Sequence, residues 1–379
     1  DGNSRMNSFL GNTQTKTVHL PYDAMIHEAR TPDTKNGAQT GFYPGGEYIF
    51  QKHFTAPQAW QGKPVSLVFE GVYQTALVYL NGWLLTRNVN GYAEFTVEAG
   101  PYLKYGADNL LKVIADNSLE PNSRWYTGSG IYRPVRLLVG NKVYLPQDTV
   151  RITTREADEG FALLDVTAQV QSASTVTERV TLQQTICRKG TAVLTDRQNL
   201  LLQPGESRTV SFRYCVDSPA LWSPENPNLY TSTMQVLEGE EELDREETGF
   251  GIRTLSIDAA HGVRINGQTV KLRGACIHHD NGILGAATLP DAEERRIRQL
   301  KEAGFNAIRS SHHPAGRALL DACDRYGVLV MDELSDVWNV RKNPYDYALY
   351  FEQDWKPTIQ KMVAKDYNHP SVILYCVGN

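Results

Sequence analysis

Ser371-Val372-Ile373-Leu374-Tyr375-Cys376-Val377-Gly378-Asn379 is an apolar run that closes on a polar side chain. A short apolar run without polar alternation is typical of a strand that is buried on both faces, as in a parallel sheet. Barrels of parallel strands carry their functional groups at the carboxyl ends of the strands. The stretch therefore predicts a buried barrel strand that places Asn379 at the mouth of a pocket.

Strand-like and helix-like segments alternate upstream of this run, from about residue 257. The pattern predicts strands at 269–277, 306–310, 328–331 and 372–377. A first helix should be capped by Asp291, with Glu294 completing a capping box, and should end at Gly304. A second helix at 319–326 should end at Gly327, and a third should pass through 359–363. Four such units in a row predict the first half of a (β/α)8 TIM barrel over residues 257–379.

The first 256 residues predict two all-β domains. Period-two alternation at 47–54 and 64–70, with an Asn81-Gly82 turn, indicates about eight short strands and a jelly-roll sandwich over residues 1–143. Short strands such as 162–170 continue through residues 144–256 and predict an immunoglobulin-like β-sandwich. No constellation of chemical groups stands out there, so the second domain is interpreted as a spacer.

A loop at 122–133 of the first domain is dense in aromatic residues, glycine and arginine. Aromatic faces beside guanidinium donors suit sugar rings, which have apolar faces edged by hydroxyl groups. A loop packed between two domains would have the same composition. Both interpretations remain open from composition alone.

Polar residues follow each of the four predicted barrel strands. They are His278, His279 and Asp280 after the first, Ser311, His312 and His313 after the second, Asp332, Glu333, Asp336 and Trp338 at the third, and Asn379 after the fourth. Since the ends of parallel strands meet at one rim, this arrangement predicts a polar pocket.

Two chemistries compete for this pocket. A metal hydrolase is disfavoured because His278 and His279 are adjacent, so they point to opposite faces of a strand, and no His-x-His spacing occurs. Glycoside hydrolysis with retention needs two carboxyl groups about 5–5.5 Å apart. Asp332 and Glu333 cannot both face one pocket, and one of them is expected to pair with Arg309. The chain therefore lacks an obvious pair of acid and nucleophile.

Composition excludes several classes of protein. The 38 basic and 43 acidic residues give a net charge of −5 without a basic stripe, which argues against nucleic acid as a partner. The longest apolar runs are under about ten residues, whereas a membrane helix needs roughly 20. Residues 1–12 have no signal-peptide core, although a removed leader stays open because the chain starts with Asp. We therefore expect a cytoplasmic protein.

Five cysteines are too few for a disulfide framework, which also favours a reducing compartment. Cys276, Cys323 and Cys376 are expected to be buried apolar residues. Cys187 and Cys215 could face each other in the second sandwich, but nothing in their spacing demands a bond.

Several motifs in this order resemble the N-terminal portion of glycoside hydrolase family 2, the group of β-galactosidases and β-glucuronidases. The similarity runs over nearly all 379 residues. Its carriers are Gly-Phe-Tyr-Pro-Gly-Gly at 41–46, Gly-Ser-Gly-Ile-Tyr-Arg at 128–133, Arg273-Gly274, His-His-Asp at 278–280, Asn-Ala-Ile-Arg-Ser-Ser-His-His-Pro at 306–314, and Asn-His-Pro-Ser-Val-Ile at 368–373 leading into Gly378-Asn379. The resemblance implies the domain order predicted above, with a sugar-binding jelly-roll first.

In that family the general acid/base glutamate immediately follows the Gly-Asn pair, and the nucleophile glutamate lies on a later strand. The resemblance therefore implies that this chain is a fragment without a catalytic residue, and that the acid/base is expected immediately after Asn379. Asn379 itself resembles the asparagine that binds the sugar 2-hydroxyl group, a contact that strengthens in the transition state.

The resemblance also implies a substrate-binding set. His278 and His312 match histidines that line the sugar subsite, and Asp336 and Trp338 resemble the loop that contacts sugar hydroxyl groups. Arg124 departs from the aspartate that many relatives carry, although relatives with Ser-Arg-Trp-Tyr exist, so Arg124 is kept as a substrate contact. The departure leaves the choice of sugar open.

The run at 278–286 is closer to β-galactosidases than to β-glucuronidases. The leading expectation is therefore a retaining β-galactosidase-type exo-glycosidase acting on a β-glycoside or oligosaccharide. A β-glucuronidase is the alternative within the family, and a non-catalytic carbohydrate-binding fragment is the alternative outside enzymes. The family implies no organic cofactor, leaves room for an assisting cation, and leaves a homo-oligomer open.

Overall fold

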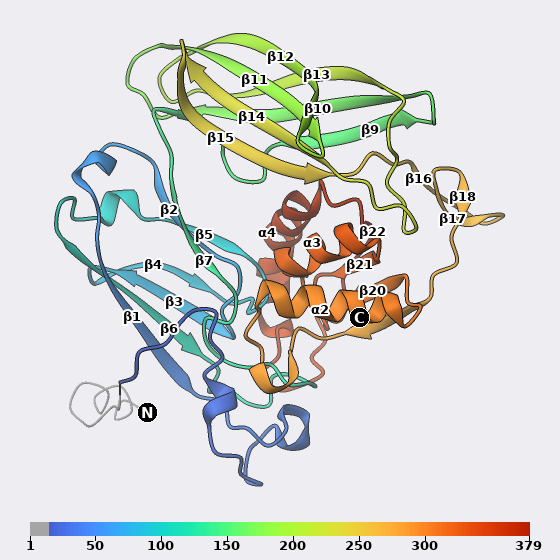
Figure 1. Cartoon of the computed structure of the whole chain (residues 1–379). Helices are drawn as coiled ribbons and strands as arrows, with labels where there is room; N and C mark the ends of the chain where they lie inside the picture. The colour runs from blue at the N-terminus through green and yellow to red at the C-terminus, as the bar shows by residue number, and fades with distance from the viewer. Residues whose placement is uncertain (1–14) are drawn as a thin grey trace.

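The computed structural model describes residues 15–379 (Figure 1). Two β-sandwiches, coloured blue to cyan and green to yellow, lie against a smaller unit of helices and parallel strands at the C-terminal end, coloured orange to red. No helix among these described residues is long and apolar enough to cross a membrane.

The first sandwich consists of a four-stranded and a three-stranded antiparallel sheet. The larger sheet has the order β1-β6-β3-β4, with β1 Glu47–Thr55, β6 Asp108–Asp116, β3 Thr75–Leu80 and β4 Trp83–Asn88. The smaller has the order β5-β2-β7, with β5 Phe95–Glu98, β2 Val65–Phe69 and β7 Val135–Val139. Alternate residues such as Phe69, Val78 and Ala115 fill the core between the sheets, which explains the period-two pattern of the sequence.

Short 3-10 helices connect these strands or precede them. They are η1 Met25–His27, η2 Gly37–Thr40, η3 Gln58–Trp60 and η4 Gly100–Tyr102. In the hairpin β3-β4, Asn81 and Gly82 both have positive φ, as the Asn-Gly turn predicts.

The second sandwich lies across the top of the view in Figure 1. One sheet has the order β13-β10-β8 with β9 also on β10, and the other has the order β12-β11-β14-β15. The bounds are β8 Val143–Tyr144, β9 Arg151–Ala157, β10 Phe161–Ser172, β11 Glu178–Arg188, β12 Thr191–Leu202, β13 Ser207–Asp217, β14 Tyr230–Glu238 and β15 Glu241–Phe250. Leu164, Leu182 and Met234 lie in its core. A small sheet of β16 Leu255–Asp258, β17 Gly262–Ile265 and β18 Gln268–Thr269 follows.

The third unit is a parallel sheet in sequential order, β19-β20-β21-β22. Its strands are β19 Gly274–Ile277, β20 Ala307–Ser310, β21 Leu329–Glu333 and β22 Val372–Cys376. The connecting helices are η5 Gly282–Leu284, α2 Pro290–Glu302, α3 Arg317–Tyr326 and α4 Ala348–Asp366. Ile297, Leu320 and Val330 form a shared core of helices and sheet. Sequential parallel strands with helical crossovers make this unit part of a TIM barrel, as predicted.

Two local predictions are wrong. Helix α2 begins at Pro290 with Leu289 at its N-cap, and no side chain caps it, so Asp291 lies inside the first turn and forms no capping box. Proline suits the first helical position because it lacks an N–H group that would be unpaired there anyway. The predicted strand at 269–277 is divided into β18 and β19. The predicted stop of α3 at Gly327 is confirmed, since Gly327 is left-handed.

The cysteine predictions are confirmed only in part. Cys323 is buried, but Cys276 is exposed and Cys376 is half-buried. Cys276 pairs in register with Arg309, whereas its neighbour Ala275 pairs with Ile308 of the core. Alternation therefore turns Cys276 away from the helices. All five cysteines, including Cys187 and Cys215, are free.

Candidate active site

The polar residues that follow the four parallel strands meet at one end of the sheet. His278 follows β19, His312 follows β20, Asp336 follows β21, and Asn379 follows β22. The strands run parallel in register, from Cys276 opposite Arg309 to Glu333 opposite Cys376. The side chains that were predicted to line a pocket therefore lie close to one another.

Asn379 is held at both ends of its side-chain amide. Its Nδ2 donates to Asp336 Oδ1 at 3.1 Å, and Arg309 Nη2 donates to its Oδ1 at 3.1 Å. Because one end donates to a carboxylate and the other accepts from a guanidinium, the amide has a single favourable orientation. The end of β22 therefore presents a fixed amide rather than a freely rotating one.

Asp336 is the centre of a cationic cluster. Arg124, from the loop of the first sandwich, donates from Nε to Asp336 Oδ2 at 2.9 Å and also donates from Nη2 to Oδ1. Lys342 Nζ lies 3.1 Å from Oδ1 and 2.6 Å from the backbone carbonyl oxygen of Asp336. Burial alone would raise the pKa of Asp336, but hydrogen bonds from Arg124, Asn379 and Lys342 hold that pKa below its ordinary value. Asp336 is therefore a carboxylate at neutral pH.

Glu333 is the partner of Arg309, as one of the two adjacent carboxyl groups was predicted to be. Arg309 Nε donates to Glu333 Oε2, and His312 Nδ1 lies 2.8 Å from Oε1. Asp332 turns to the other side of β21, where its Oδ1 accepts from the backbone N–H of Ala315 at 2.8 Å. Strand alternation thus separates the two carboxyl groups, and Glu333 is fully buried between two cationic or donor groups.

His278 is fixed by its contacts on two sides. Its Nδ1 lies 2.6 Å from the carbonyl oxygen of Ser311, so Nδ1 carries a proton and donates. Burial, together with the neighbouring His312, lowers the pKa of His278, so the neutral ring has a bare lone pair on Nε2. Trp125 stacks on this ring with centroids 4.8 Å apart and an interplanar angle of 13°. The indole Nε1 of Trp125 donates in turn to the Tyr92 hydroxyl at 3.1 Å.

Trp338 borders the same end of the sheet with 46% of its surface exposed. A Cβ added at Gly378 would lie 2.8 Å from Trp338 Cε2 and Nε1. Glycine at this position therefore lets the indole ring lie directly against the end of β22. An aromatic face beside fixed polar groups is suited to a sugar ring.

The structure thus brings together all six residues predicted to bind substrate: Asn379, His278, His312, Asp336, Trp338 and Arg124. It also adds two that were not singled out. Trp125 lies in the loop at 122–133, and the aromatic composition of that loop could have pointed to it as a site residue. Lys342 lies in a loop after β21, where neither spacing nor hydrophobic pattern distinguishes it.

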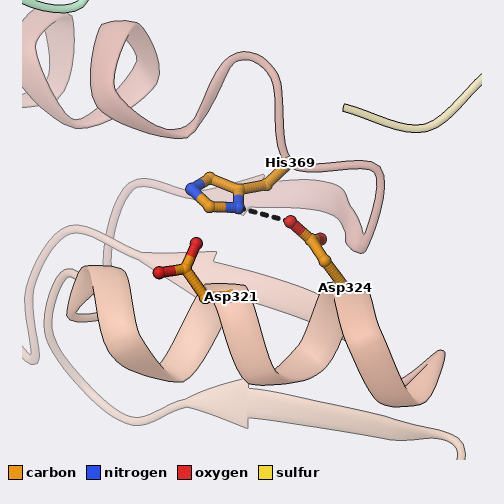
Figure 2. Close-up of side chains that lie close together, drawn as sticks. All are labelled: Asp321, Asp324 and His369. Carbon is orange, nitrogen blue, oxygen red and sulfur yellow. Dashed lines mark hydrogen bonds and ion pairs between the residues drawn. The ribbon is translucent and has the colours of Figure 1, made fainter. Parts of the chain in front are cut away.

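A separate group of possible metal ligands lies away from this end. Among residues 15–379, Asp321, Asp324 and His369 bring one ligand atom each within 4.8 Å of the others (Figure 2). His369 Nδ1 lies 2.6 Å from Asp324 Oδ2, and the N–H of Ser371 donates to Asp324 Oδ1 at 3.0 Å. Although burial would lower it, the pKa of His369 is raised by Asp324 and other nearby carboxylates.

A protonated imidazole has no lone pair to offer a metal. Asp324 lies on α3, whereas His369 and Ser371 lie just before β22. This cluster is therefore accounted for as an ion pair that joins α3 to the start of β22.

Three family models match consecutive parts of the chain. Residues 16–161 match "Glycosyl hydrolase 2 galactose-binding domain-like", 143–253 match "Glycosyl hydrolases family 2", and 259–379 match "Glycosyl hydrolases family 2, TIM barrel domain". The chain belongs to glycoside hydrolase family 2. The three parts of this family 2 chain are a jelly-roll-type sandwich, an immunoglobulin-like sandwich and a partial TIM barrel, in the predicted order.

Curated relatives and solved structures agree with this membership. Over 96% of its length, the family 2 chain is 37% identical to "Beta-galactosidase BoGH2A" of Bacteroides ovatus, of which it covers 43%. It is 26% identical to a "Beta-glucuronidase" of Bacteroides fragilis, over 96% of the chain and 53% of that protein.

A solved family 2 structure from Bacteroides cellulosilyticus superposes with a TM-score of 0.94 at 38% identity, over 98% of this chain and 48% of that one. The chain thus spans about half the length of the relatives it matches.

Proposed function

We propose that the protein is a retaining exo-glycosidase of the β-galactosidase type, which hydrolyses terminal β-linked sugars. The observation that carries this proposal is the amide of Asn379, held between Arg309 and Asp336 at the end of β22 in a family 2 barrel. The 37% identity to a protein named as a β-galactosidase supports the choice of sugar.

Each residue of the site has a chemical role in this proposal. Asn379 binds the sugar 2-hydroxyl group, and this contact strengthens as charge develops in the transition state. The bare Nε2 of His278 accepts a hydrogen bond from another hydroxyl group, and His312 lines the same side. Trp338 covers an apolar face of the ring, while Arg124 and Asp336 contact the hydroxyl groups at the edge of the pocket.

Neither Glu333 nor Asp336 is proposed as the acid or the nucleophile. Glu333 is held by Arg309 and His312, and Asp336 by Arg124, Lys342 and Asn379. A general acid needs a raised pKa, whereas that of Asp336 is lowered. We propose that both catalytic glutamates lie outside residues 1–379, so that these residues supply the binding half of the sugar subsite.

The proposal includes a division of labour along the chain. Residues 1–143 form the sugar-binding jelly-roll, 144–256 a spacer sandwich, and 257–379 the part of the barrel that carries the site. The family-model matches at 16–161, 143–253 and 259–379 support this division. Arg124 and Trp125 support a role of the first unit in the site, since both reach it from the jelly-roll loop.

Hydrolysis of p-nitrophenyl β-galactoside tests the proposal, with p-nitrophenyl β-glucuronide as the competing substrate. The longest polypeptide that contains these 379 residues should prefer the galactoside, whereas residues 1–379 alone should bind sugar without turnover. Turnover by residues 1–379 alone would contradict the assignment of the catalytic glutamates. A preference for the glucuronide would replace the proposed sugar.

A β-glucuronidase is the second candidate, because three cationic side chains lie at this end of the sheet. Arg124, Arg309 and Lys342 outnumber the two carboxylates that they contact, Glu333 and Asp336. A surplus of positive charge favours an anionic sugar. If the protein were a carbohydrate-binding fragment without any enzymatic role, no polypeptide containing it would hydrolyse either sugar.

A further inference from the structure

A second polar cluster lies directly behind the candidate active site, where the first sandwich meets the barrel. A cavity of about 10 Å³ is lined there by residues that include Arg133, His279, Glu293 and His313. These four side chains are only 4, 5, 2 and 2% exposed. Arg133 comes from the jelly-roll, and the other three come from the barrel, so the cavity belongs to the joint between the two units.

Each of these side chains has one polar atom without a hydrogen-bond partner among the described residues. The atoms are Arg133 Nε, His279 Nδ1, Glu293 Oε2 and His313 Nε2. Glu293 Oε2 lies 3.6 Å from Arg296 Nη1, which is beyond hydrogen-bond distance. Polar atoms in protein interiors are nearly always paired, because an unpaired one keeps the full cost of its desolvation. Glu293 Oε2 still has the charge of Arg296 beside it, whereas the other three atoms have no partner among the described residues and together point to a ligand.

The donor and acceptor character of these atoms follows from their bonded neighbours. His279 Nε2 lies 2.8 Å from the carbonyl oxygen of Thr127, so Nε2 carries the proton. Burial lowers the pKa of His279 to about 3, and Nδ1 is therefore a bare acceptor. His313 has the opposite tautomer, since its Nδ1 lies 3.3 Å from the carbonyl oxygen of Pro314. Burial also lowers the pKa of His313, which leaves Nε2 as a second bare acceptor.

Arg133 supplies the complementary donor. Its Nη1 donates to the carbonyl oxygen of Tyr92 at 2.8 Å and its Nη2 to that of Pro314 at 3.1 Å. The Nε–H group is the remaining donor. A molecule that donates to His279 and His313 and accepts from Arg133 would satisfy all three side chains.

Size and charge restrict the identity of this ligand. A cavity of roughly 10–15 Å³ holds one water molecule, which needs two to four polar partners. A metal ion is disfavoured, because the His279, Glu293 and His313 atoms are not among the described groups whose ligand atoms come within 4.8 Å of one another. The guanidinium groups of Arg133 and Arg296 line the same cavity and would repel a cation.

We propose that this cavity is the binding site of one structural water molecule, which donates to His279 Nδ1 and His313 Nε2 and accepts from Arg133 Nε. The water joins the jelly-roll to the ends of β19 and β20. It lies one residue behind His278 and His312, which face the candidate active site.

A crystal structure of the protein at a resolution that shows ordered solvent tests the proposal directly. It should show one solvent peak of full occupancy within hydrogen-bond distance of all three atoms. A dry cavity, an imidazole ring turned so that both its nitrogens meet protein atoms, or an anomalous signal from a metal ion would each overturn the proposal.

The sign of a stability change provides an independent test. If a water pairs these atoms, His313→Leu removes one of its partners and lowers the Tm by roughly 2–4 °C. In either case the substitution also removes the Nδ1–H donor to the carbonyl oxygen of Pro314, so an unchanged or higher Tm is the decisive outcome and counts against the water.

His261→Leu is the matched control, because it removes a histidine that is exposed on the β16–β17 turn. Its Tm should stay near that of the parent protein. A His313→Leu protein at least as stable as this control would contradict the proposal, whatever glycoside the protein acts on.

Discussion

Replacing Arg317 with methionine should loosen the joint between all three structural units. Arg317 is the first residue of α3 and donates from Nε and Nη2 to the two carboxylate oxygens of Glu94, both at 2.8 Å. Its Nη2 also lies 2.6 Å from Asp148 Oδ2. Glu94 precedes β5 of the jelly-roll, and Asp148 precedes β9 of the second sandwich. One guanidinium group therefore bridges the barrel to both sandwiches.

The burial of the three side chains determines how much stability Arg317→Met should remove. The side chains of Arg317, Glu94 and Asp148 are 21, 11 and 22% exposed. Removing one partner of a fully buried ion pair costs about 3–5 kcal/mol. Partial exposure reduces this value, and Glu94 keeps a hydrogen bond from Gln147 Nε2 at 2.7 Å. We therefore expect Arg317→Met to lower the free energy of unfolding by roughly 2–4 kcal/mol.

Denaturant unfolding, together with limited proteolysis of the segments between the units, measures this loss. Arg298→Met is the matched control, because Arg298 forms an exposed pair with Glu302 on α2 at 3.1 Å, and exposed pairs contribute only about 0–1 kcal/mol. Equal stability of the Arg317 and Arg298 variants would refute the bridging role.

Unfolding at acidic pH provides a further check on the ion pair between Arg317 and Glu94. Burial would raise the pKa of Glu94, but Arg317 and the other nearby cations lower it below its ordinary value. A carboxylate with a depressed pKa stabilises the fold above its unfolded pKa, and this contribution is lost as the pH falls through the folded pKa. The difference between the parent and Arg317→Met should therefore shrink in acid. A difference that stays constant below the ordinary carboxyl pKa would contradict the ionic origin of the effect.

Three further predictions concern two residues of the site and one of the second sandwich. Asn379→Ala should lower kcat/KM for a β-galactoside by roughly 100-fold or more in the longest polypeptide that contains these residues, because the proposed 2-hydroxyl contact would act in the transition state. A tenfold or smaller loss would remove Asn379 from that role. Gly378→Ala should displace the Trp338 ring, since the new Cβ would lie 2.8 Å from it, and should weaken sugar binding measured by calorimetry; unchanged affinity would contradict the stacking role of Trp338. Burial, with Asp148 and Asp244, raises the pKa of Glu246 to about 7, so the stability of the parent should fall as the pH rises from about 4.5 to 7. Glu246→Gln should remove this loss, so the variant should be more stable than the parent at pH 8 by roughly 1–2 kcal/mol. The prediction would be contradicted if the Tm of the variant, measured from pH 4 to pH 8, did not rise relative to that of the parent.

The sequence predicted the barrel strands from their runs of apolar residues, but burial on both faces is wrong for β19 and the end of β22, where Cys276 and Tyr375 are exposed. It also predicted a partner for Arg309, because alternation allows only one of Asp332 and Glu333 to face inward. The predicted start of α2 was wrong because Asp291 matched a capping pattern, while the helix begins at Pro290 with Leu289 at its N-cap, two residues earlier than predicted. Lys342 was missed because its role depends on a loop conformation that brings it back to Asp336. A contact that forms because a loop folds back leaves no periodic pattern in the sequence.

The packing interpretation of the loop at 122–133 does not exclude the sugar-binding one. Arg124 and Trp125 face the candidate site, where they contact Asp336 and His278. Further along, Thr127 accepts from His279 in the buried joint. The same alternation separates His278 from His279, so one histidine faces the pocket and its neighbour faces the joint. A loop that packs between domains therefore also reaches the candidate site, because that site lies immediately in front of the interface that the loop fills.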